Sequence, residues 1–68
     1  MYGLEVRRKI RRVRKAMGYK CGDMAECLGI SMSHYCRMEV GRRRMTLQYL
    51  EAIADILEIE VSDLYRGC

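Results

Sequence analysis

Apolar residues recur every three to four positions along this chain, in five blocks separated by polar or glycine-containing stretches. That spacing places them on one face of a helix, whereas a half-buried strand would alternate every second residue. The pattern predicts helices over about residues 4–17, 21–28, 31–40 and 46–57, and a short fifth helix from about residue 62. No block alternates for long enough to form a strand, so the sequence predicts an all-α fold.

The apolar face of each predicted helix supplies the expected core. Its members in chain order are Val6, Ile10, Val13, Met17, Met24, Ala25, Leu28, Tyr35, Met38, Leu47, Leu50, Ile53, Ala54, Leu57, Leu64 and Tyr65. Ser31 and Thr46 are good N-caps, because their hydroxyls accept a backbone N–H of the first helical turn. Gly18, Gly29 and Gly41 each follow a helical block, where a left-handed residue commonly ends a helix.

Residues 21–40 have the spacing of a helix-turn-helix. Its two helices are too short to be stable alone in water, so they must pack against each other and the rest of the chain. Ala25 allows that close approach, and Gly29 allows the positive φ of a tight turn between near-perpendicular helices. Leu28 and Ile30 flank the turn with apolar side chains.

Length and composition describe one small globular domain over residues 1–68. With 68 residues, 50% hydrophobic and 32% charged, the chain supports a single core rather than a deep enzyme cleft. Charged residues interrupt every stretch well before the roughly 20 apolar residues that a membrane span requires. Basic residues also occupy five of the six positions 7–12, where a signal peptide would be apolar, so we expect a cytoplasmic protein.

Charge is divided unevenly along the chain. Residues 1–44 hold twelve Lys and Arg against four acids, a net charge of +8, whereas residues 45–68 hold one Arg against five acids, a net charge of −4. A basic half favours a polyanionic partner, and an acidic half suits a face turned away from it. Nucleic acid is the leading candidate, and an anionic membrane surface bound by the basic helix 4–17 is the competing one.

Four cysteines and one histidine suggest a metal or disulfide site at first sight. Zinc ligands usually come in pairs with two to four residues between them, a spacing absent from Cys21, Cys27, His34, Cys36 and Cys68. Disulfides need an oxidising compartment, which a cytoplasmic location does not provide. We therefore expect reduced thiols, no metal, no cofactor and no small-molecule ligand.

Two segments resemble the Cro/C1-type (XRE-like) helix-turn-helix family: residues 24–31 (MAECLGIS) and residues 37–43 (RMEVGRR). The resemblance extends over about residues 6–65 and includes the closing segment VSDLY. It implies a lambda-repressor-like domain of five helices that binds duplex DNA, usually as a homodimer that represses or otherwise regulates transcription.

The third helix, residues 31–40, would then lie in the major groove with its outer side against the bases. Because Tyr35 and Met38 face the core, other side chains of this helix point outward. The candidate base contacts are Met32, Ser33, His34 and Arg37. Arg37 is the most informative, since a guanidinium donates two hydrogen bonds to guanine O6 and N7. The alternative for Arg37 is an ordinary solvated charge.

Phosphate contacts are expected at both ends of the motif. Arg42, Arg43 and Arg44 lie on an exposed loop, either as a phosphate clamp or as a run that only aids solubility. The family commonly has Ser or Thr followed by Gln at the start of the second helix. In the family this Gln contacts the DNA backbone. This chain has Lys20 and Cys21 there, so the helix cap is poorer and the Gln contact is missing, although Lys20 can supply a phosphate contact. Lys20 and Cys21 are the candidate backbone contacts at this end of the motif.

Two residues carry structural expectations. The resemblance implies that Arg14 pairs with Glu39 and ties the first helix to the third. The remaining cations of residues 7–15 are expected to be mostly solvated. Tyr35 stands where a branched aliphatic residue is usual, so its hydroxyl is expected to reach the domain edge or a partner.

Apolar residues near the C-terminus exceed what a core of this size needs. A two-fold contact between copies of the chain is therefore expected to use Leu57, Ile59, Val61, Leu64 and Tyr65. The alternative is that all five belong to the core.

Other roles for the same fold stay open at this point. One is an antitoxin or restriction-control regulator that acts with a partner gene product, and another is a protein-interaction adaptor. The charge of the basic half argues against an adaptor, which has no need of it. An enzyme is not expected, because the chain has one His, no plausible catalytic triad and no phosphate-binding loop.

Overall fold

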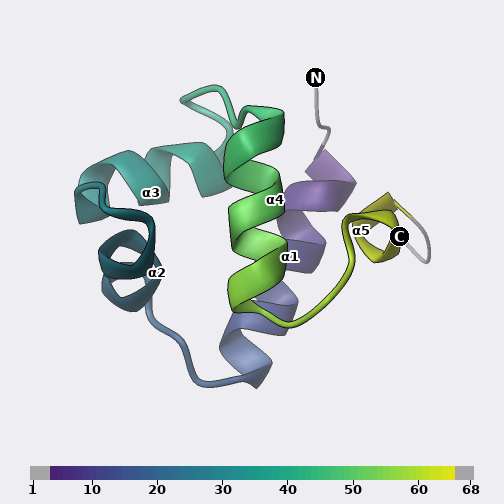
Figure 1. The fold of residues 1–68 in the computed structure, drawn as a ribbon. Helices are drawn as coiled ribbons and strands as arrows, with labels where there is room; N and C mark the ends of the chain where they lie inside the picture. The colour runs from purple at the N-terminus through teal and green to yellow at the C-terminus, as the bar shows by residue number, and fades with distance from the viewer. Residues whose placement is uncertain (1–3, 66–68) are drawn as a thin grey trace.

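The computed structural model describes residues 4–65, which form five helices and no strand. The helices are α1 (Leu4–Ala16), α2 (Cys21–Leu28), α3 (Met32–Val40), α4 (Leu47–Ile56) and α5 (Val61–Tyr65). In Figure 1, α2 and α3 lie on one side of α4, and α5 lies on the other. The all-α prediction is confirmed, and each predicted helix boundary lies within one residue of the observed one.

Hydroxyl caps and glycines set most helix ends. Ser31 Oγ accepts the His34 N–H at 3.1 Å, and Thr46 Oγ1 accepts the Tyr49 N–H at 3.3 Å. Positive φ angles occur at the three predicted glycines, Gly18 at 83°, Gly29 at 72° and Gly41 at 89°. The local sequence therefore fixes where α3 and α4 begin and where α2 and α3 end.

The start of α2 is capped through Asp23. The Lys20 side chain is only a hydrogen-bond donor, so it cannot accept a first-turn N–H. Instead, Asp23 Oδ2 accepts the Lys20 N–H at 2.9 Å. The Asp23 carboxylate also suits the positive end of the helix dipole, which compensates in part for the weak cap.

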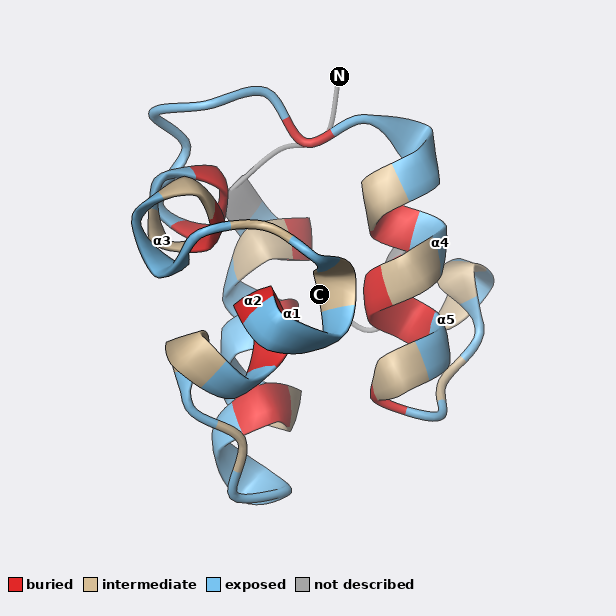
Figure 2. Cartoon of the chain, turned by 60° about the vertical axis from the view of Figure 1, so that its left-hand side comes forward, coloured by how far each residue is buried: buried red, intermediate tan, exposed pale blue. Residues whose placement is uncertain are grey.

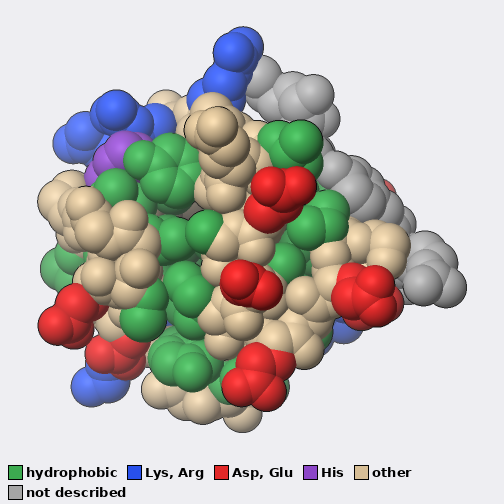
Figure 3. Space-filling model, in the orientation of Figure 1, with side chains coloured by type: hydrophobic (Ala, Val, Ile, Leu, Met, Phe, Trp, Pro, Cys, Tyr) green, Lys and Arg blue, Asp and Glu red, His purple; other side chains and the backbone are tan. Residues whose placement is uncertain are grey.

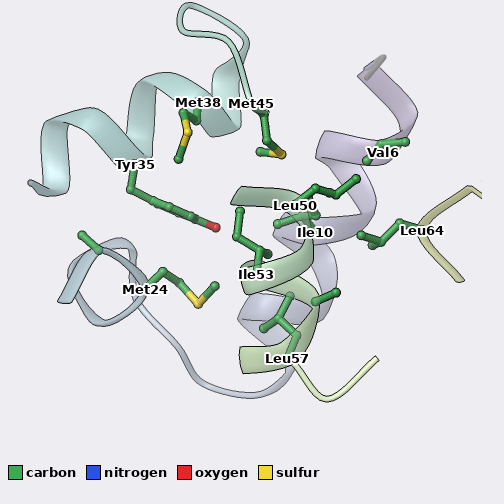
Figure 4. Close-up of a cluster of buried hydrophobic side chains, with 12 residues drawn as sticks. Val6, Ile10, Met24, Tyr35, Met38, Met45, Leu50, Ile53, Leu57 and Leu64 are labelled. Carbon is green, nitrogen blue, oxygen red and sulfur yellow. The ribbon is translucent and has the colours of Figure 1, made fainter. Parts of the chain in front are cut away.

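The core lies between the helices, with the buried side chains pointing inward from α1, α3 and α4 (Figure 4). Its members are Val6, Ile10, Met24, Ala25, Tyr35, Met38, Met45, Leu50, Ile53, Ala54, Leu57 and Leu64. Exposed segments lie on the outward sides of the helices (Figure 2). Met17 and Leu47 are 42% and 50% exposed, so their assignment to the core is wrong. Each stands at a helix end, where the chain is turning away from the core.

Leu57 and Leu64 belong to the core and not to an interface. Both are buried within the single chain, because α5 packs against α1 and α4. A side chain without exposed area has nothing further to bury against a second copy, so their assignment to a dimer contact is wrong. Ile59 and Val61 are half-buried and retain some surface, and the Tyr65 side chain lies outside the described residues.

Candidate nucleic-acid interface

A buried ion pair fastens α1 to the inner side of α3. Arg14 Nε and Nη2 donate to the two carboxylate oxygens of Glu39, each at 2.9 Å, and both side chains are 6% exposed. Arg14 Nη1 donates to the Tyr19 carbonyl oxygen at 2.8 Å, just before α2. The bond to Glu39 raises the pKa of Arg14 further, so the guanidinium stays charged. The pair implied by the resemblance is present and fixes α3 in place.

Tyr35 occupies the centre of the inner side of α3. Its ring is fully buried and points from α3 toward α4 (Figure 4). The hydroxyl has no hydrogen-bond partner among the described residues, so the expectation that it reaches the domain edge is wrong. Burial first, and the neighbouring Glu39 carboxylate second, raise the pKa of Tyr35 well above its ordinary value. The phenol therefore stays neutral inside the core.

The outer side of α3 is exposed along its length. Ser33 and Arg37 are exposed, Met32 is 58% exposed and Val40 is 61% exposed. Because these side chains lie outside the core, they are free to contact a ligand. A helix with one free side has the shape that the major groove admits.

The first turn of α2 lies beside the start of α3. Gly22 lies close to Met32, since a Cβ added to this glycine would stand 3.7 Å from Met32 Sδ, at van der Waals distance. Lys20 is exposed and Cys21 is half-buried. Burial, followed by the nearby Cys36, raises the pKa of Cys21, so its thiol stays neutral. Lys20 therefore carries the positive charge on this edge of the interface.

The arginine loop begins where α3 ends. The backbone N–H groups of Arg42 and Arg43 donate to the Arg37 carbonyl oxygen at 2.8 and 3.1 Å, which folds the loop back onto the last turn. The side chains of Arg42, Arg43 and Arg44 are exposed, and the next residue, Met45, is buried. Three positively charged side chains thus lie on the loop that begins at the C-terminal end of α3.

His34 is held toward α4. Its ring meets the Tyr49 ring edge-on, with centroids 5.6 Å apart and planes at 73°. The residue is half-buried, unlike Ser33 and Arg37. Of the four candidate base contacts, His34 is therefore the one restrained by a neighbouring side chain.

Positive and negative charges lie on different faces. Figure 3 views the α4 side, where acidic side chains are spread over the surface and Lys and Arg lie at its edges. Glu51, Asp55 and Glu58, on α4 or just after it, are exposed. A polyanion is therefore repelled from the α4 side and attracted to the α3 side.

Three cations beside α3 were expected to be solvated charges and have a more specific position. Arg7, Arg8 and Arg11 of α1 line a hollow next to Val40 of α3. Helical spacing could have predicted this position, because residues 7 and 11 lie on the same side of the helix as Arg14. The sequence-based prediction placed Arg14 against the third helix but did not place Arg7 and Arg11 there.

Among residues 4–65, no group of three or more His, Cys, Asp or Glu side chains is arranged to hold a metal ion. Cys21, Cys27 and Cys36 are free thiols, whereas Cys68 lies outside the described residues. No helix in the described part of the chain has the length and apolarity needed to cross a membrane.

Known proteins resemble the chain over most of its length. The helix-turn-helix domain family matches residues 5–64. The chain is 33% identical over 61 residues to the cryptic phage CTXphi transcriptional repressor RstR of Vibrio cholerae serotype O1. This match covers 90% of the chain and 54% of the repressor, so the chain spans about half the length of the curated relative it matches.

Two solved structures share the fold. The N-terminal DNA binding domain of SinR from Bacillus subtilis matches with a TM-score of 0.81 and 24% identity, over 96% of each chain. SinR, the master regulator for biofilm formation, in complex with DNA matches with a TM-score of 0.75 and 26% identity, over 88% of this chain and 97% of that one. The family and these relatives are DNA-binding regulators, not enzymes. The chain belongs to the helix-turn-helix family, in its Cro/C1-type (XRE-like) form.

Proposed function

We propose that the chain is a sequence-specific regulator of transcription, a repressor, that binds duplex DNA with α3 in the major groove. The observation that carries the proposal is the difference between the two sides of α3. The inner side is buried and held by an ion pair, whereas the outer side is exposed and is followed in the chain by three exposed arginines. The repressor homologue and the SinR–DNA complex support it independently. The proposal places the protein in the cytoplasm, with its DNA.

Base recognition rests on the outer side of α3. Arg37 donates two hydrogen bonds to guanine, the commonest specific contact in the major groove. Ser33 hydrogen-bonds base edges with little discrimination, and Met32 lies against a thymine methyl group. His34, restrained by Tyr49, bonds a base or phosphate at the edge of the groove.

Phosphate contacts lie on either side of this helix. Lys20 and the first turn of α2 at Cys21 meet one backbone, because a helix N-terminus attracts anions. Arg42, Arg43 and Arg44 meet the DNA backbone near the other end of α3. These contacts position the protein without reading sequence.

A homodimer completes the proposal, with residues 1–68 as one domain in each copy and the helix-turn-helix at about residues 21–40. The half-buried Ile59 and Val61 retain surface for a two-fold contact near the C-terminus. Tyr65, whose side chain lies outside the described residues, is expected to join that contact. Two half-sites should then lie about one helical turn apart, roughly 34 Å. Sedimentation showing a monomer at high micromolar concentration, with an asymmetric single-site footprint, would contradict the dimer.

Selection of bound duplexes from a random pool tests the function directly. The expected result is one enriched, near-palindromic motif that contains a guanine at the position read by Arg37. A pool that stays random after repeated selection, while the protein remains folded, would contradict sequence-specific binding.

A further inference from the structure

Arg7, Arg8 and Arg11 converge on one hollow between α1 and the end of α3. Their spacing of one and four residues places Arg7 and Arg11 on the same side of α1 and Arg8 beside them. Val40 and Glu39 form the α3 wall of this hollow. Arg8 and Arg11 are exposed, so their guanidinium groups are accessible to a ligand.

The positive charge in the hollow is not neutralised from within. Among the described residues that line it, Glu39 is the one acid. Both of its carboxylate oxygens already accept hydrogen bonds from Arg14 at 2.9 Å. Three guanidinium groups around one small hollow repel one another, and an anion bound between them relieves that repulsion.

Arg7 connects the hollow to the arginine loop. Its guanidinium lies directly against Gly41, where a Cβ would collide with it, and Gly41 immediately precedes the loop. Arg7 Nη1 is buried with no hydrogen-bond partner among the described residues. Arg7 thus places a guanidinium with an unbonded Nη1 between the hollow and the start of the loop.

The hollow is continuous with the outer side of α3. Val40 lines the hollow and is 61% exposed, and Arg37 lies one turn before it on the same helix. A major groove is about 12 Å wide, so a helix seated in it has a phosphate backbone on each side. The backbone on the α1 side of α3 meets this hollow first.

We infer that Arg8 and Arg11, supported by Arg7, bind a backbone phosphate of the DNA duplex beside the groove that α3 occupies. The site lies on α1, outside the helix-turn-helix, and adds a contact that anchors the first helix to the DNA. This inference rests on the proposed function.

Adjacent arginines on α1 provide a matched test. Arg11 lines the hollow and Arg12 does not, although both are exposed. Replacing either with Ala removes the same charge and keeps a strong helix former. Arg11→Ala should weaken preferred and random duplexes by similar factors and make the log affinity–log salt slope shallower by up to about 0.9, the value for one whole phosphate contact. Arg8→Ala should behave alike, whereas Arg12→Ala should leave the slope near that of the wild type.

A neutral methylphosphonate at single backbone positions locates the contact. At one flanking position it should weaken the wild type clearly more than Arg11→Ala, which has already lost part of the contact. Both variants must first show wild-type helix content by circular dichroism, and the wild type must bind its selected duplex. If Arg11→Ala and Arg12→Ala then have equal salt slopes, the inference is overturned. Failure of the wild type to bind any duplex would overturn the proposed function, and this inference with it.

Discussion

The inner and outer sides of α3 differ in almost every physical property. Tyr35, Met38 and Glu39 on the inner side are buried, and Arg14 holds Glu39 through two hydrogen bonds. On the outer side, Ser33 and Arg37 are exposed and lie outside the core. In the proposed complex, this helix of nine residues would stabilise the fold through its inner side and contact DNA through its outer side.

The proposal predicts that the two sides respond differently to substitution. A change on the inner side should lower the free energy of unfolding, whereas a change on the outer side should alter DNA affinity in a folded protein.

The largest effect is expected from breaking the buried pair. Glu39→Ala leaves the Arg14 guanidinium buried without its counter-ion, which should lower the free energy of unfolding by about 3–5 kcal/mol. Urea denaturation followed by circular dichroism measures it. The next residue provides the control, because Val40 lies on the outer side and Val40→Ala should change stability by less than about 0.5 kcal/mol. Similar losses for both variants would contradict the division of α3.

Removing the loop charges should affect binding and leave folding unchanged. Replacing Arg42, Arg43 and Arg44 with Ala should weaken preferred and random duplexes alike. The slope of log affinity against log salt should become shallower by about 0.9 for each phosphate that the variant no longer neutralises. Fluorescence anisotropy over a salt series provides the measurement. Unchanged binding to every duplex would contradict the placement of DNA along α3.

The smallest effect concerns the unpartnered hydroxyl of Tyr35. Tyr35→Phe removes a buried polar group that has no hydrogen-bond partner among the described residues, so it should stabilise the fold by about 1 kcal/mol. DNA preference should not change, because the ring stays on the inner side. A loss of stability would show that the hydroxyl has a bonding partner in solution.

The same variant gives a pH-dependent readout. The pKa of Tyr35 is raised in the folded state, chiefly by burial, so the unfolded state loses this proton first as pH rises above about 10. The stability difference between the wild type and Tyr35→Phe should therefore be larger above that pH than near neutrality. Chemical denaturation of both proteins at about pH 7 and about pH 10.5 measures the change.

Much of the fold could be predicted because its signals are local. Apolar spacing located the helices, and Ser31, Thr46, Gly29 and Gly41 marked helix ends through chemistry within a few residues. The end of α4 carries no such mark. Glu58 adopts a φ of 59°, a conformation that side chains disfavour, and only the packed fold shows it.

The part of the candidate site that lies on one helix was predictable, because helical geometry alone determines which of its side chains face outward. Residues opposite Tyr35 on the same helix had to face outward, which identified Ser33 and Arg37. The position of Arg7 against Gly41 depends on how α1 crosses the end of α3, and no spacing along the chain encodes that crossing. Apolar spacing placed Leu57 in the core, but only the packed fold shows that it keeps almost no surface for a second copy.

The most direct measurement compares the base preference of Arg37→Ala with that of the wild type. Affinities for the selected duplex and its single-base variants are measured after confirming equal helix content. Arg37→Ala should lose about 1–3 kcal/mol on the selected duplex and discriminate less at one base position, because a base edge carries sequence information. An equal loss on every duplex, with preference unchanged at all positions, would contradict base recognition by the outer side of α3.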